Sequence, residues 1–288
     1  MSSEWSLTST GNAPEGILSE QIYTEKAFDH EAARHWIDGT KYFSLWLSAI
    51  YVILIFAGQQ WMSSRSPFDL RIPLFLWSSV LSVFSIIGTF RTVPELYSAV
   101  VNYGWTYSVC NSFFYHGSSG FWAFLFTMSK AYELGDTLFI VLRRQPLIFL
   151  HWYHHITVML YTFYSYPEHV SAGRWYIVMN YIVHSFMYTY YALRAVRVPV
   201  PSLVRMSVTL LQILQMIIGL VVSVSVFINK RNGVKCDQSH FFINAAILMY
   251  GSYLVLFIHF FIQQYAVPAR KKSTSNDKVS VEGVKKLH

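Results

Sequence analysis

Three histidines, His151, His154 and His155, lie within about one helical turn of a segment that is otherwise apolar and aromatic. A fourth, His184, lies on the next apolar segment, four residues after Asn180. Imidazole can bind a metal ion, move a proton or act as a nucleophile. A lone buried histidine more often serves packing, but this grouping favours a chemical role.

Two further polar series recur at helical spacing. Lys130, Glu133 and Asp136 are three residues apart, and so are Gln212 and Gln215. Residues three or four positions apart share one face of a helix, so each series forms a stripe. Four polar side chains each lie ten residues from an arginine: Glu133, His154, His184 and Gln215. At about 1.5 Å per helical residue, all four are predicted at a common depth of roughly 15 Å.

Structural roles are alternatives for several of these residues. Lys130 could pair with Glu133 or Asp136 to join helices, a role that is compatible with catalysis. Gln212 and Gln215 could hydrogen bond between helices. Three tyrosines could donate to a substrate, Tyr188, Tyr190 and Tyr191, but they could equally belong to an aromatic belt at the membrane interface.

The composition indicates that these side chains lie in a membrane. Of 288 residues, 53% are hydrophobic and 13% are charged. A bilayer core of about 30 Å needs about 20 apolar helical residues. Seven segments qualify: 42–62, 72–90, 121–142, 147–166, 175–193, 206–228 and 241–266. The sequence therefore predicts an all-α membrane protein with three parts: an amino-terminal segment (1–41), a seven-helix domain (42–266) and a basic tail (267–288).

The basic residues predict the orientation. Arginine and lysine gather in alternate loops and in the tail, and such loops face the cytoplasm. Residues 1–41 would then lie in the lumen, without a recognisable cleaved signal peptide. The chain ends in Lys-Lys-Leu-His, which is similar to the dilysine retrieval signal of endoplasmic reticulum membrane proteins. We therefore expect a multi-pass protein of that membrane with a cytoplasmic carboxyl terminus.

The same orientation places both cysteines, Cys110 and Cys236, on the luminal side. A disulfide is stable in an oxidising lumen, so we expect a bridge, with two free thiols as the alternative.

A di-iron desaturase or hydroxylase is a second interpretation of His-x-x-His-His. Such a centre needs many nitrogen or carboxylate ligands, and the chain has one motif of this kind among its 11 histidines. A lipid-binding membrane protein without catalytic activity is a third interpretation. We expect no bound metal and no cofactor.

The chain resembles the ELO family of very-long-chain fatty acid elongases, the 3-ketoacyl-CoA synthases of the endoplasmic reticulum. Four motifs carry the resemblance: KAYELGDT (130–137), HWYHH (151–155), NYIVHSFMYTYY (180–191) and TLLQILQ (209–215). Similarity extends over about residues 42–265. The sequence LIFL (147–150) before HWYHH is similar to that of the elongase branch that acts on saturated and monounsaturated chains. Elongases of polyunsaturated chains can share the HWYHH form.

The resemblance implies a first helix beside a ring of six helices around an acyl tunnel. It also implies decarboxylative condensation of acyl-CoA with malonyl-CoA. Because both cysteines are predicted on the luminal side, we favour His154 as the nucleophile, with His184 assisting. His151 and His155 would donate hydrogen bonds to substrate oxygens, Asn180 would set the His184 tautomer, Glu133 or Asp136 would orient a motif histidine, and Lys130 would offset their charge. Direct condensation with His154 as base is the alternative.

Cations at the cytoplasmic side are candidates for binding CoA phosphates, unless they only set the orientation. They are Arg143, Arg144, Arg194, Arg197, Lys271 and Lys272. The predicted partners are acyl-CoA, malonyl-CoA, membrane lipid, other enzymes of the elongation cycle and a second copy of the chain. No nucleic acid partner is expected.

Overall fold

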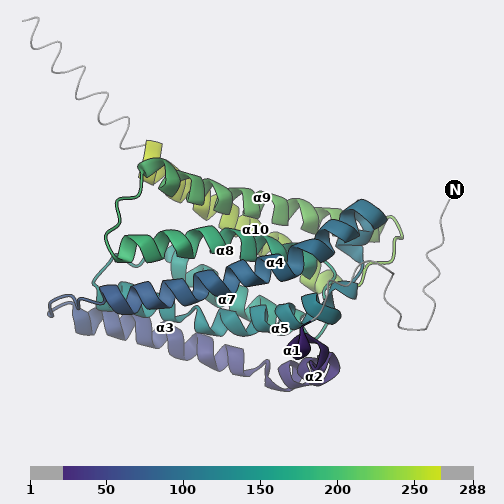
Figure 1. Ribbon diagram of the computed structural model, residues 1–288, viewed down its shortest axis with the longest axis horizontal. Helices are drawn as coiled ribbons and strands as arrows, with labels where there is room; N and C mark the ends of the chain where they lie inside the picture. Colours follow the sequence, from purple (N-terminus) through teal and green to yellow (C-terminus); the bar gives the residue numbers. More distant parts are fainter. Residues whose placement is uncertain (1–21, 267–288) are drawn as a thin grey trace, which may run out of the picture.

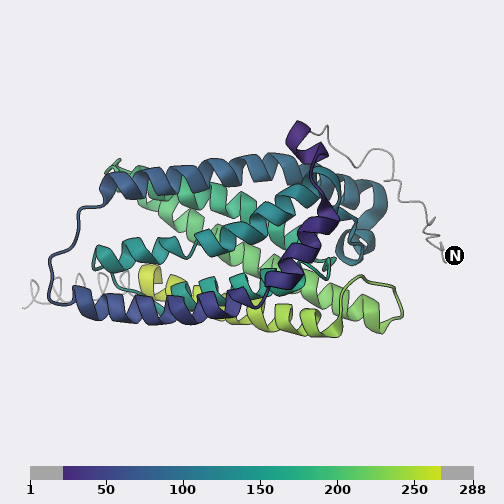
Figure 2. The same cartoon turned by 90° about the horizontal axis from the view of Figure 1, so that it is seen from below.

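The computed structural model describes residues 22–266, and this part of the chain is helical (Figure 1). The long helices lie side by side along the long axis of the molecule, and two short helices, α1 and α2, lie at one end (Figures 1 and 2). The all-α prediction is therefore confirmed for the described residues.

Six long helices correspond to predicted segments: α3 (Phe43–Met62), α4 (Arg71–Cys110), α7 (Phe149–Ser165), α8 (Gly173–Ala195), α9 (Ser202–Arg231) and α10 (His240–Phe261). A π-helical turn at Ile262–Ala266 continues α10. The predicted segment 121–142 is instead two helices, α5 (Gly117–Tyr132) and α6 (Gly135–Leu142). The break falls between Lys130 and Asp136, inside one of the polar stripes.

Within residues 22–266, four helices are long and apolar enough to cross a membrane: Phe43–Met62, Arg71–Cys110, Ser202–Arg231 and His240–Tyr265. The protein is thus a membrane protein with several apolar helices. The α5 and α6 pieces are 16 and 8 residues long, and α7 has 17 residues. These pieces are shorter than the roughly 20 residues that a single crossing needs. The count of seven crossings therefore stays a prediction.

Helix α4 extends well beyond its predicted segment 72–90 because partners from other elements neutralise the charges that follow. Arg91 pairs with Glu25 of α1, and Glu95 accepts from Arg174 Nε of α8 at 2.9 Å. Arg174 also donates to the backbone oxygens of Ser108 and Asn111, near the end of α4. The helix bends at Gly104, whose φ of 84° favours glycine.

The helices pack in recognisable pairs. Helix α4 packs mainly against α8, α9 packs against α10, and α3 contacts both α6 and α7. Buried aromatic and sulfur-containing side chains fill the interior, among them Phe126, Met159 and Tyr181. This packing brings α5, α6, α7 and α8 around one volume, where the polar stripes meet.

The described part of the amino-terminal segment contains two helices, which the sequence did not predict. It forms α1 (Tyr23–Lys26) and α2 (His30–Thr40), with Asp29 capping α2 through the backbone N–H groups of Glu31 and Ala32. The buried Glu25 carboxylate accepts hydrogen bonds from Arg91, Ser118 and Trp122. A short 3-10 helix, η1 (Phe113–Tyr115), lies beneath this segment.

Cys110 and Cys236 form a disulfide between the end of α4 and the loop before α10. Hydrogen bonds surround it: Asp237 N donates to Cys110 O at 2.9 Å, and Ser112 donates to the Asp237 carboxylate. The bridge therefore joins two connections at the same end of the bundle as α1 and α2.

Candidate active site

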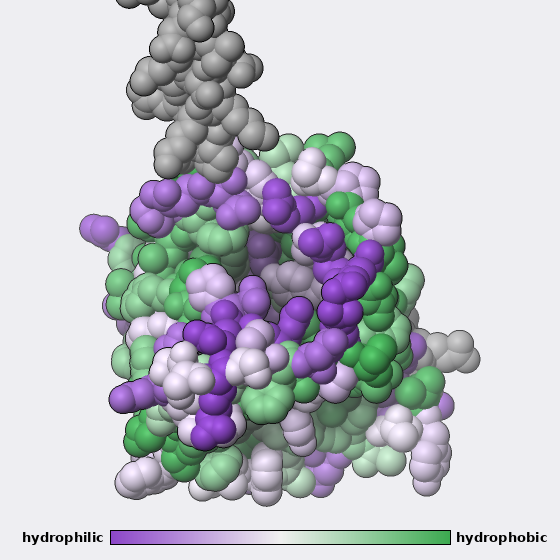
Figure 3. All heavy atoms as spheres, turned by 90° about the vertical axis from the view of Figure 1, so that its left-hand side faces the viewer, coloured by the Kyte–Doolittle hydropathy of each residue, from purple (hydrophilic) through white to green (hydrophobic). Residues whose placement is uncertain are grey.

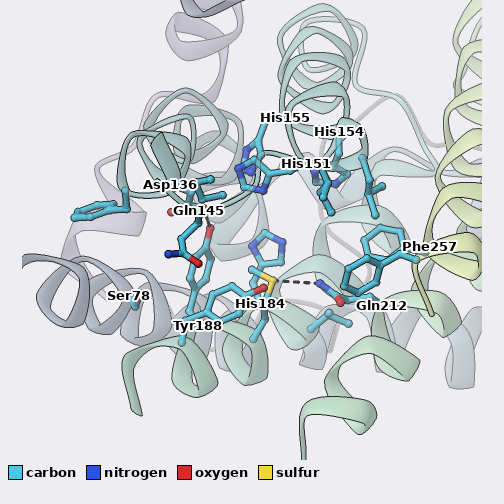
Figure 4. A pocket seen from close by; sticks show the side chains of 18 of the residues that line it. Ser78, Asp136, Gln145, His151, His154, His155, His184, Tyr188, Gln212 and Phe257 are labelled. Atoms are coloured by element: carbon cyan, nitrogen blue, oxygen red, sulfur yellow. Dashed lines mark hydrogen bonds between the residues drawn. The ribbon is translucent and has the colours of Figure 1, made fainter. Parts of the chain in front are cut away.

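The histidine motif lies on the first half of α7, where its spacing places all three rings on one side of the helix. The ring centres of His151 and His155 are 4.5 Å apart, and those of His154 and His155 are 5.6 Å apart. All three side chains line one cavity, and His184 lines it from α8 (Figure 4). The ring nitrogens of His154 have no hydrogen bond partner among the described residues, so they remain free to meet a ligand.

Asn180 and His184 face the same side of α8 because they are four residues apart. Lys130 Nζ donates to Asn180 Oδ1 at 2.8 Å, and this identifies the other end of the amide as its NH2 group. Asn180 Nδ2 then donates to His184 Nε2 at 3.0 Å. A neutral imidazole that accepts at Nε2 carries its hydrogen on Nδ1. This geometry suits the expected role of Asn180 in setting the His184 tautomer. Lys130 fixes the orientation of the Asn180 amide.

The break between α5 and α6 turns the Lys130 and Glu133 side chains toward α8. Lys130 Nζ is 2.7 Å from Glu133 Oε1, and both side chains are almost fully buried. The same carboxylate oxygen accepts from Ser129 and lies 3.8 Å from His184 Nδ1. The ion pair proposed as a structural alternative is present, and it also contacts the histidine on α8.

Asp136 has different partners from those expected. Its carboxylate accepts from Trp77 Nε1 at 2.6 Å and from the Tyr188 hydroxyl at 2.7 Å. The Tyr188 ring in turn meets the His184 ring edge-on, with centres 5.2 Å apart. We expected Glu133 or Asp136 to orient a histidine of the motif. Instead, the motif histidine with a side-chain hydrogen bond is His151, whose Nε2 lies 2.9 Å from the Thr137 hydroxyl.

The cavity has a volume of about 460 Å³ and opens at the end of the bundle where α6, α8 and α9 meet their loops. Figure 3 shows this end hollowed and rimmed with hydrophilic residues. Most of the residues predicted to contact substrate line the cavity: Tyr188, Tyr191, Gln212, Gln215, Arg143 and Arg194. Gln212 donates to Met187 Sδ across the α8–α9 contact (Figure 4).

The remaining candidate cations are not brought to the cavity. Arg144 donates to the backbone oxygen of Arg65 at 2.9 Å, and Arg197 does not line the cavity wall. Lys271 and Lys272 lie outside the described residues. The mouth thus carries Arg143 at the C-terminal end of α6 and Arg194 in the last turn of α8.

A second cavity of about 40 Å³ continues from the first toward the other end of the bundle. The two share His154, Asn180, Gln215 and Met216 as lining residues. The wall of the second cavity is mainly apolar and aromatic, with Phe126, Val158 and Ile177 among its members. His154 therefore lines both cavities, at the place where the histidine-lined cavity adjoins the aromatic one.

Sequence reasoning missed several residues around this site. Tyr51 of α3 contacts Thr137, Trp77 of α4 contacts Asp136, and the Tyr253 ring of α10 lies 4.8 Å from the His154 ring. Each comes from an element far along the chain, and no spacing near the motifs marks it. Within residues 22–266, no group of three or more histidine, cysteine, aspartate or glutamate residues is arranged to hold a metal ion.

The fold and the site define a helical membrane protein with a histidine-lined cavity that passes from a cationic mouth to an apolar interior. Comparison of sequences then gives the family. The family model described as ELO: GNS1/SUR4 family matches residues 36–273, and the chain belongs to this family.

Similar proteins from other organisms are named very long chain fatty acid elongases. The chain is 48% identical over 257 residues to human very long chain fatty acid elongase 6, covering 88% of this chain and 97% of that protein. It is 47% identical over 253 residues to elongase 6 of Drosophila melanogaster, covering 86% and 80%. Identity to human elongase 3 is 42% over 232 residues, covering 80% and 85%. The chain is thus a fatty acid elongase by family.

Proposed function

We propose that the protein condenses a long-chain acyl-CoA with malonyl-CoA to give 3-ketoacyl-CoA, CO2 and free CoA. The observation that carries this proposal is the position of His154, with free ring nitrogens, where the histidine-lined cavity adjoins the aromatic cavity. The second cavity, about 40 Å³ in this structure, would have to widen to admit an acyl chain. A chain lying there would bring its thioester to His154, while the CoA would extend toward Arg143 and Arg194.

The proposed chemistry proceeds in two steps. A ring nitrogen of His154 attacks the thioester carbon, the carbon–sulfur bond breaks, and CoA leaves with a proton as the thiol. Malonyl-CoA then loses CO2, and the enolate carbon attacks the acyl carbon and releases the imidazole. One proton is taken up overall. His151, His155 and His184 would stabilise the oxygen charge that develops in both steps.

We further propose that the protein lies in the endoplasmic reticulum membrane with α1 and α2 in the lumen. The seven-crossing arrangement, a ring of six helices with α3 beside it, and the three-part division at residues 41 and 266 belong to the same proposal. We also propose that the protein uses no metal or cofactor, that it interacts with other enzymes of the elongation cycle, and that two copies pair. The preference for saturated or monounsaturated chains is also part of it.

The decisive experiment separates acyl transfer from condensation. Purified protein is incubated with acyl-CoA alone and analysed by intact-protein mass spectrometry, and malonyl-CoA is added afterwards. We expect a mass increase equal to the acyl group, its disappearance on addition of malonyl-CoA, and 3-ketoacyl-CoA as product. His154→Ala should abolish both the adduct and the product.

His259→Ala is the matched control because His259 is an exposed histidine on α10 that does not line the cavity. This variant should form adduct and product as the wild type does. Product without an adduct would favour direct condensation with His154 as base. Loss of activity on treatment with a chelator would favour a metalloenzyme, and lipid binding without product would favour a non-catalytic protein.

A further inference from the structure

We propose that Tyr51 of α3 is a positioning residue that acts on His151 through the hydroxyl of Thr137. The Tyr51 hydroxyl lies 2.6 Å from Thr137 Oγ1, and Thr137 Oγ1 lies 2.9 Å from His151 Nε2. Tyr51 is 6% exposed and Thr137 is fully buried. The proposal deepens the condensation proposed above and rests on it, because it assigns His151 a defined state in that reaction.

Counting hydrogens fixes the direction of this chain. Thr137 has one hydroxyl hydrogen and two side-chain partners, and accepting from both would leave its own buried hydrogen without an acceptor among the described residues, so it donates to one of them and accepts from the other. If Thr137 donated to Tyr51, the buried phenol hydrogen would find no acceptor among the described residues, and leaving a buried donor unpaired is costly. Tyr51 therefore donates to Thr137, and Thr137 donates to His151 Nε2.

The consequence is a single tautomer of His151. Because Nε2 accepts, the ring hydrogen of the neutral imidazole is on Nδ1. No described residue takes that hydrogen: the nearby His155 Nδ1 is buried without any hydrogen bond partner. His151 lines the cavity, so its Nδ1–H is left to donate to an oxygen of the ligand. The opposite tautomer would present a lone pair and would repel a developing oxyanion.

The contact also gives α3 a role beyond packing. Its buried positions Ser44, Ser48, Tyr51 and Ile55 are three or four residues apart and face the bundle. Among them, Tyr51 reaches Thr137 in the first turn of α6, just after the α5–α6 break. The helix that precedes the catalytic motifs by many residues is thereby connected to the histidine motif through one threonine.

Four variants test the chain of hydrogen bonds by their steady-state kinetics. Thr137→Val keeps the shape but removes the hydroxyl, and we expect kcat to fall roughly 10- to 100-fold with little change in KM, as for other groups that orient a catalytic histidine. Thr137→Ser keeps the hydroxyl and should retain kcat. Tyr51→Phe should lower kcat by a smaller factor, roughly threefold to tenfold, because Thr137 can still donate. The double variant Y51F/T137V should be no slower than T137V.

Tyr181→Phe is the matched control. It also removes a buried tyrosine hydroxyl, which donates to the Trp122 backbone oxygen at 2.9 Å, but Tyr181 does not line either cavity. We expect its thermal stability to fall as in Y51F while kcat is unchanged. If Y51F and T137V lower stability in the same way and leave kcat intact, the positioning role is wrong. If their effects on kcat multiply in the double variant, the relay is wrong.

A spectroscopic measurement separates this inference from the proposed function. Histidine labelled with ¹⁵N in the ring reports by solid-state NMR which nitrogen carries the hydrogen, and the His151 signals are assigned by their loss in His151→Gln. We expect protonated Nδ1 in the wild type and a mixture of tautomers in Y51F/T137V. This result would support the relay even if the wild type made no 3-ketoacyl-CoA, whereas an unprotonated Nδ1 would overturn the relay in an enzyme that does make it.

Discussion

At the scale of single residues, the site depends on buried charges that are neutralised in pairs. Lys130 and Glu133 are 2% and 3% exposed, and Lys130 also holds the Asn180 amide. One oxygen of Glu133, Oε2, already has no hydrogen bond partner among the described residues. The pair therefore neutralises buried charge and also contacts the Asn180 amide and His184, so the structural role and the proposed positioning role can be separated by mutation.

Lys130→Met leaves the Glu133 carboxylate buried without its cation. Breaking a buried ion pair in this way costs about 3–5 kcal/mol, so we expect a large fall in the thermal stability of the purified protein. The double variant K130M/E133L removes both charges and should recover most of that stability, because an apolar pair of similar size is tolerated. Thermal unfolding in detergent measures both effects.

Activity should not recover with stability in that double variant. Without Lys130, nothing fixes which end of the Asn180 amide faces His184, so K130M/E133L should fold well and remain roughly 10- to 100-fold slower than wild type. A double variant that regains full activity would show that Asn180 needs no orientation from Lys130.

At the scale of helices, the closely packed pair is α4 and α8, and α8 holds Asn180 and His184 of the site. A Cβ atom built at Gly88 of α4 would lie 2.5 Å from the Tyr181 ring. Tyr181 is buried and its hydroxyl is held by the Trp122 backbone oxygen, so the ring has no room to move away. Small residues at such positions let membrane helices approach closely.

Gly88→Ala therefore tests how tightly α4 and α8 must pack. Overpacking typically costs about 1–3 kcal/mol, which exceeds the gain of up to about 1 kcal/mol from replacing glycine by alanine in a helix. We expect a net loss of thermal stability. Gly251→Ala on α10 is the control, since a Cβ atom there meets nothing within 4 Å, and it should be neutral or slightly stabilising. Equal stability of both variants would contradict the packing argument.

At the scale of the whole molecule, local spacing predicted which residues lie at the site better than it predicted the hydrogen bonds between them. The intervals within 151–155 and 180–184 follow from helical periodicity, and those side chains do converge. Lys130 joins them through Asn180, although the α5–α6 break interrupts the stripe 130–136. The hydrogen bonds from Thr137 to His151 and from Trp77 to Asp136 depend on how distant helices pack, and spacing within one segment carries no information about that. The span 72–90 was too short for the same reason, because the partners of Arg91 and Glu95 lie elsewhere in the chain.

The end of the molecule opposite the cavity mouth contains a second group of histidines, which joins α2 to the connections before α5 and α8. The ring centres of His30 and His116 are 6.1 Å apart, and those of His116 and His169 are 6.4 Å apart. His169 also stacks on Tyr115. Docking of residues 22–41 on the bundle therefore brings three imidazoles close together, with His30 and His169 half-buried and His116 still exposed. One buried nitrogen of His30 and one of His169 have no hydrogen bond partner among the described residues.

Burial lowers the pKa of all three rings, and that of His169 falls to about 4, with Arg34 and His116 adding to the effect. Asp29 and Glu31 oppose the shift only in part, acting on His30 and His116 respectively. His30, His116 and His169 thus bind fewer protons when the segment is docked than when it is undocked, because their pKa values then return toward the ordinary value of 6.5. Its stability is complete above pH 6.5 and is lost as the pH falls toward 4. Glu25 has a lowered pKa: burial raises it, but the hydrogen bonds from Arg91 and Trp122 outweigh burial, so its contribution persists until below about 4.5.

Acidification should therefore loosen residues 22–41 through the histidines alone while the transmembrane helices stay protected. We expect hydrogen exchange in this segment, corrected for the intrinsic pH effect, to be roughly threefold or more faster at pH 5.5 than at pH 7.5. His169→Asn keeps a residue that tolerates the φ of 46° and removes the imidazole with the lowest pKa, so it should reduce the pH dependence. His35→Gln is the control, because the His35 side chain is 74% exposed and its removal should leave the dependence unchanged. Equal exchange at both pH values in the wild type would show that these imidazoles do not control the docking of α1 and α2.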